Sequence, residues 1–100
     1  MPDLLLSLVV PNDIVQDIED LLLSRHDLVA GFTANPIDSH GSAVPLVEAA
    51  ELVSGHSPRT HIRMVASESS LRAILAEIKT TLPHANLSYW LLPVIEAGHL

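Results

Sequence analysis

The 100-residue chain contains no cysteine and few basic residues, and each absence excludes a class of protein. Without cysteine there is no disulfide scaffold, no thiolate nucleophile and no cysteine-based zinc site. Lysine and arginine number five against 12 acidic residues, which gives a net charge of -7. Proteins that bind the phosphate backbone of nucleic acid carry a basic surface instead. We therefore expect no nucleic-acid partner.

The sequence also lacks a membrane-spanning run and the common catalytic motifs. The apolar run 4–10 follows Asp3 and ends at Pro11, so it is too short for a span and unlike a signal peptide. This indicates a cytoplasmic protein without direct membrane insertion. No G-x-S-x-G, paired-acid or H-E-x-x-H motif occurs. We expect a protein that is not an enzyme; a small ferredoxin-like isomerase or oxygenase with His61 as its base is the third alternative.

Hydrophobic residues make up 48% of the chain and charged residues only 17%. One hundred residues form a single domain with one core. That core is too small to hide all of these apolar side chains. Part of the surplus is expected to lie in a subunit interface.

Short apolar or alternating runs predict four strands, at 4–10, 27–35, 60–66 and 86–94. Asn35-Pro36 is expected to end the pairing of the second strand, and Pro93 places the fourth strand at a sheet edge. Tyr89 and Trp90 are neighbours in the fourth strand and so point to opposite faces. One of them is expected to be an interface anchor.

Apolar residues at helical spacing predict two helices. The first is capped by Asn12 or Asp13, and the second by Ser67 or Ser69 and ends at Pro83. Their buried faces comprise Ile14, Ile18, Leu21 and Leu22 in the first helix, and Leu71, Ile74, Leu75, Ile78 and Leu82 in the second.

The order strand, helix, strand, long segment, strand, helix, strand predicts an α+β fold. It is the ferredoxin-like βαββαβ plan, with a four-stranded antiparallel sheet and two helices on one face. The long segment, 36–58, is interrupted by proline and glycine and contains one helix-like patch at 46–53. Because the first and last strands are apolar at successive positions, the second sheet face is expected to be covered by other subunits.

Several short motifs occur in one order along the chain: GFT at 31–33, HG at 40–41, ELVSG at 51–55, YW at 89–90 and PVIEAG at 93–98. This set resembles the PII-like superfamily, named after the nitrogen-regulatory PII proteins. In particular it resembles a small uncharacterised branch often encoded beside heavy-metal efflux pumps.

The resemblance implies a homotrimer that senses a small ligand or a metal state. Its central loop at about 36–58 would correspond to the T-loop that contacts a protein partner, here a heavy-metal efflux system, and the function would be metal resistance. Ligands in that superfamily lie between subunits near the base of this loop. The corresponding ligand-binding or partner-loop residues are Thr33, His40, Gly41, Glu51, Arg59 and Arg63.

The sequence departs from PII proteins at two points. The segment 65–74, where PII proteins have a glycine-rich loop that holds ATP phosphates, contains neither glycine nor lysine. The central segment contains no tyrosine for uridylylation.

Two further interpretations concern charged and metal-binding side chains. Arg59 and Arg63 either bind a carboxylate or phosphate between subunits or pair with Glu48 or Glu51 of a neighbour. Of the six histidines, His40, His56 and His61 lie in or beside the central segment. Imidazole is a common ligand of Zn and Cu. A histidine-based metal buffer or chaperone is therefore the alternative function.

Overall fold

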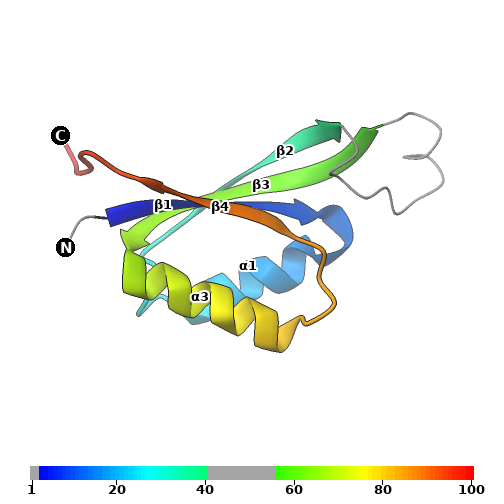
Figure 1. The fold of residues 1–100 in the computed structure, drawn as a ribbon, viewed down its shortest axis with the longest axis horizontal. Coiled ribbons are helices and arrows are strands. Elements are labelled where there is room, and N and C mark those ends of the chain that lie inside the picture. Colours follow the sequence, from blue (N-terminus) through cyan, green and yellow to red (C-terminus); the bar gives the residue numbers. More distant parts are fainter. Residues whose placement is uncertain (1–2, 41–55) are drawn as a thin grey trace.

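The protein is described by a computed structural model covering residues 3–40 and 56–100. Four strands form one antiparallel sheet in the order β2-β3-β1-β4, and two helices cover one of its faces (Figure 1). The elements are β1 (Asp3–Pro11), a 3-10 turn (Asn12–Ile14), α1 (Val15–Ser24), β2 (Thr33–His40), β3 (His56–Ser67), α3 (Glu68–Thr81) and β4 (Ser88–Pro93). This confirms the predicted βαββαβ plan.

The core lies between the helices and the inner face of the sheet. Alternation along β1 sends Leu6, Leu8 and Val10 toward the helices, and all three are fully buried. The helices contribute the residues that their spacing predicted, since Ile18 and Leu22 of α1 and Leu71, Ile74 and Ile78 of α3 are also buried. The helices are joined at the surface by Arg25, whose Nη1 donates to Glu77 Oε2 at 2.7 Å.

The helix caps differ from each other. Ser67 accepts a hydrogen bond from the Ser70 amide at 3.2 Å and caps α3, as the sequence predicted. Neither Asn12 nor Asp13 caps α1 through its side chain, which corrects that prediction. The chain instead enters α1 through the 3-10 turn, a frequent lead-in to a helix.

The second strand lies later in the chain than predicted. Residues 27–32 are not in a strand, and β2 pairs with β3 from Thr33 to His40, including Pro36 opposite Thr60. Proline does not end the pairing because β2 is an edge strand, where every second N–H faces away from the sheet. The predicted central loop is therefore shorter, since 36–40 and 56–58 are strand. The rest of it, 41–55 with its helix-like patch, lies outside the described residues.

Strands β2 and β3 extend beyond β1, whose pairing with β3 ends at Pro11 opposite Arg59. Residues 38–40 and 56–58 thus form a two-stranded arm that projects from the sheet (Figure 1). The described N- and C-terminal segments lie together at the other end of the sheet, where the Val94 amide donates to the Asp3 carbonyl at 3.2 Å. No helix among the described residues is long and apolar enough to cross a membrane.

Candidate functional site

The face of the sheet opposite the helices carries most of the predicted site residues that the structure describes. Strand register arranges its side chains in rows across the sheet. An apolar row holds Val65, Leu5 and Leu92, the next holds Thr33, Arg63, Ser7 and Trp90, and a third holds Asn35, His61, Val9 and Ser88. Val65, Trp90 and Leu92 are 40%, 42% and 47% exposed. This open face is therefore apolar at one end and polar toward the arm.

Thr33 and Arg63 meet at the start of β2, as direct register partners. They line a shallow cavity of about 400 Å³ together with apolar side chains, among them Leu5 and Val65, and with Gly31. Arg63 Nη2 donates to Asn35 Oδ1 at 3.4 Å, a long bond that links this row to the next one. Two of the predicted ligand residues are thus brought together.

His61 and Trp90 contact each other across β1. Their ring centroids are 5.8 Å apart with the planes tilted by 45°. The register places Ser7 and Val9 of β1 between them, and Ser7 is only 2% exposed although it lies on the open face. Trp90 therefore lies on the open face, while Tyr89 faces α3. This confirms that the two rings point to opposite faces.

The imidazole of His61 is partly withdrawn from water. Its Nε2 is buried and has no hydrogen-bond partner in the described part of the chain. Burial, and secondarily the charge of Arg63, lower the pKa of His61 below its ordinary value. The ring is therefore neutral at pH 7.

Arg59 lies at the base of the arm, opposite Pro11 and Ile37. It is only 3% exposed and borders a smaller cavity of about 230 Å³ with Asn12 and Asp38. A guanidinium this deeply buried needs partners within the protein. Arg59 is therefore held inside the protein, whereas Arg63 is exposed and is the predicted arginine that a ligand can reach.

Of the three histidines predicted to bind metal, two are neighbours in the backbone register of β2 and β3. The backbone register pairs His40 directly with His56 in the arm. His61 lies five residues along β3 from His56, which is about 17 Å at the rise of a strand. Among the described side chains, which comprise residues 3–40 and 58–100, no group of three metal-binding side chains occurs. The structure thus brings together two of the three histidines.

Two predicted residues, Gly41 and Glu51, lie outside the described residues, as does Glu48. Asn35 and Ser7 also belong to the open face, although the sequence pattern does not mark them as site residues. Only strand register places them there, because Asn35 precedes a proline that indicates the end of a strand, and Ser7 lies within an apolar run.

Comparison with solved structures relates this fold to known proteins. A DUF3240 family protein from Shewanella baltica is 23% identical with a TM-score of 0.81, and covers 100% of this chain and 98% of its own. CPII, a nitrogen regulatory PII-like protein from Thiomonas intermedia bound to ADP, AMP and bicarbonate, is 14% identical with a TM-score of 0.72, and covers 100% and 98%. CutA1 from Oryza sativa is 18% identical with a TM-score of 0.71, and covers 98% and 84%.

These likenesses establish a fold shared with PII-like and CutA1 proteins. No curated protein matches the sequence. A family model does match it, over residues 1–100, which is the span that contains the sheet, both helices and the cavity of Thr33 and Arg63. The chain therefore belongs to the family described as Protein of unknown function (DUF3240).

Proposed function

We propose that the protein is a PII-like regulatory protein that binds a small anion at the cavity of Thr33 and Arg63. Binding there would act on a partner protein through the segment between β2 and β3. The observation that carries this proposal is the meeting of Thr33 and Arg63 at the open mouth of that cavity. The cavity lies beside the start of β2 and the second half of β3, at the end of these strands away from the segment that they lead into and out of.

The chemistry of the cavity favours a carboxylate or bicarbonate. A guanidinium offers two parallel N–H donors that match the two oxygens of a planar anion, and a threonine hydroxyl adds a third donor. The PII-like protein from Thiomonas intermedia is bound to bicarbonate as well as to ADP and AMP. Because 65–74 contains no glycine or lysine to hold phosphates, bicarbonate is the first ligand to test.

Isothermal titration calorimetry with bicarbonate, AMP and ADP tests this site. We expect bicarbonate to bind and Arg63→Met to weaken binding at least about tenfold, the effect of removing one charge-assisted pair. Arg72→Met is the matched control, because Arg72 lies on α3 and pairs with Glu68 at 2.8 Å. Equal binding by wild type and Arg63→Met would refute the site.

The proposal includes a homotrimer that covers the open face. The exposed Val65, Trp90 and Leu92, which lie around the partly buried Leu5, support it, since contiguous apolar surface of this kind usually marks an interface. Covering this face would also enclose the shallow Thr33 and Arg63 cavity, which is open in the single chain. The anion would then lie between subunits.

The partner that the resemblance suggests is a heavy-metal efflux system. Affinity capture from cells grown with and without excess metal would identify it. Capture by the wild-type protein and its loss with Arg63→Met would support signalling through the anion site. Capture of the same proteins by wild type and by Arg63→Met would show that partner binding does not depend on the anion site.

A second function, a histidine-based Zn or Cu buffer, is favoured by the register of His40 and His56. Opposed residues in neighbouring strands have Cβ atoms about 5 Å apart, close enough for two imidazoles to share one ion. We expect His40→Ala with His56→Ala to abolish any Zn or Cu binding tighter than about 10 μM in calorimetry. His84→Ala with His99→Ala is the control pair. Unchanged binding in the first double variant would reject the arm as a metal site.

A further inference from the structure

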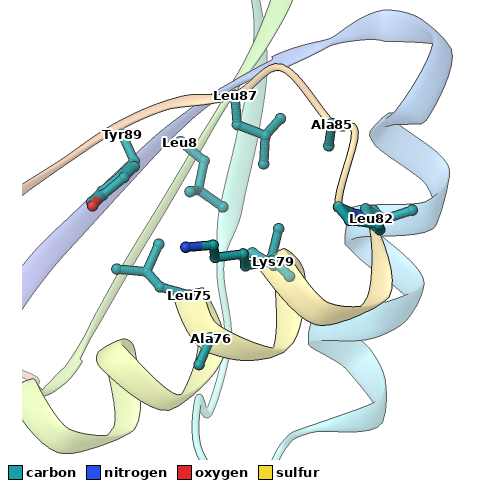
Figure 2. A pocket seen from close by; sticks show the side chains of 10 residues that line it. Leu8, Leu75, Ala76, Lys79, Leu82, Ala85, Leu87 and Tyr89 are labelled. Atoms are coloured by element: carbon teal, nitrogen blue, oxygen red, sulfur yellow. The ribbon is translucent and has the colours of Figure 1, made fainter.

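A cavity of about 400 Å³ lies between α3 and the strands β1 and β4, away from the open face (Figure 2). Its walls are aliphatic side chains from three parts of the chain: Leu8 of β1, Leu75 and Ile78 of α3, and Leu87 of the segment that leads into β4. Leu8 is fully buried, so the floor of the cavity is the core itself. The cavity therefore offers an apolar compartment of ligand size.

The apolar cavity is also lined by two residues with polar groups, Lys79 and Tyr89. Figure 2 shows the Lys79 side chain extending from α3 across the cavity, with its nitrogen turned toward the side where Tyr89 and Leu8 lie. Tyr89 is register partner of Leu8, so its ring faces α3, and it is 56% exposed. The ammonium and the phenol hydroxyl are thus placed on one side of an otherwise aliphatic space.

Lys79 has no carboxylate partner among the described residues. This is notable in a chain with 12 acidic and five basic residues, where Arg25 and Arg72 both form ion pairs. A lysine stem covers apolar surface well, but its ammonium then stays in water. Here the ammonium is left to attract an anion at the cavity mouth.

We propose that this cavity binds a medium-chain alkyl carboxylate, with Lys79 as the counter-ion of its head group and the aliphatic walls around its tail. A single ammonium and a phenol hydroxyl supply two donors, which suit the two oxygens of a monoanionic carboxylate. A more highly charged head group would be repelled by the net charge of -7. A 150 Å³ cavity holds benzene, so this volume accommodates a chain of about eight to ten carbons.

Calorimetry with sodium decanoate below its micelle concentration tests the proposal on the full chain. We expect saturable binding of one decanoate per chain, and binding of neutral decanol at least about tenfold weaker because it lacks the charge. Lys79→Met keeps the aliphatic part of the side chain but removes the charge, so this variant should bind decanoate weaker by a similar factor. Lys79→Arg keeps the charge and should keep the affinity. Arg72→Met, on the same helix but away from the cavity, is the control and leaves binding unchanged.

Charge reversal separates ligand binding from a merely structural role of Lys79. Lys79→Glu should bind decylammonium better than decanoate, the reverse of wild type. Ala85→Phe, which places a ring in the cavity, should abolish binding of both ligands, with far-UV circular dichroism confirming that it folds. If Ala85→Phe does not fold, the reversed ligand preference of Lys79→Glu is the deciding measurement.

The proposal is overturned if decanoate does not saturate, if decanol binds as tightly, or if Lys79→Met binds unchanged. It is also overturned if the cavity is filled by the exposed C-terminal segment of a second copy, in which Ile95 and Leu100 contact almost nothing in their own chain. In that case wild type binds no decanoate, and Ile95→Asp lowers the assembled mass and gains decanoate binding. The Arg63 site is on the other face, so either site can fail without the other.

Discussion

His61 shows how a single side chain acquires unusual properties from its position. It contacts Trp90 over β1, buries Nε2 without a hydrogen bond and lies on the same face as Arg63. Burial and the charge of Arg63 both lower the pKa of the ring, because an imidazolium would be desolvated and would face another cation. His61 is therefore a neutral packing residue of the open face, not a member of the arm.

This predicts a pH dependence of stability. The unfolded chain binds a proton at His61 near the ordinary pKa of 6.5, whereas the lowered pKa keeps the folded ring neutral there. As pH falls below about 6.5 the unfolded state gains the proton first, so stability is lost until the folded pKa is reached. His61→Gln cannot protonate, so it should lose less stability than wild type between about pH 7.5 and 5.5.

Urea unfolding at these two pH values and one chain concentration measures the difference. His84→Gln is the control, since His84 is exposed and lies outside the sheet. The same pH dependence in wild type and His61→Gln would contradict the effect of burial.

At the scale of elements, α3 depends on its first turn. Ser67 ends β3 and caps α3 through its hydroxyl, so one residue closes the strand and starts the helix. Loss of such a cap costs about 1 kcal/mol. Ser67→Ala should lower the free energy of unfolding by that amount, measured from the urea midpoint. Ser69→Ala, a neighbour that does not cap the helix, should cost less; an equal loss would point to a role other than capping.

The elements also show what the sequence could predict. Both helices and the order of elements along the chain followed from periodicity. Buried positions such as Leu71 and Ile74, for example, repeat with the period of the helix. The limits of β2 did not follow, because Pro36 breaks a central strand but is tolerated at an edge, and edge position is a property of the whole sheet. The pairing of Thr33 with Arg63 depends on the same register.

The cavity of Lys79 was beyond sequence reasoning for a related reason. Lys79 lies on α3 next to the buried Ile78, and its spacing indicates an exposed position, which is correct. The spacing does not predict how far α3 lies from β4. It also does not predict that the segment 82–87 borders the cavity. Local pattern determines the elements, while the sites arise where elements from distant parts of the chain meet.

At the scale of the whole molecule, the two faces of the sheet differ in a way that a single chain does not satisfy. The inner face is closed by α1 and α3, whereas the outer face exposes Trp90 and Leu92. Covering these exposed side chains would remove further apolar area from water. Each Å² of apolar area buried in this way contributes about 25 cal/mol of stabilisation. This is the physical reason to expect assembly through this face.

We predict that wild type is a trimer at micromolar concentration by light scattering, and that Trp90→Asp dissociates or unfolds it. A carboxylate buried in the interface without a partner costs several kcal/mol. Tyr89→Asp is the matched control, because it introduces the same charge one residue away on the opposite face and should keep the trimer mass. Trp90 is also the single tryptophan, so its fluorescence reports directly on the interface. A monomeric wild type, or a trimer of Trp90→Asp, would show that the open face has another use.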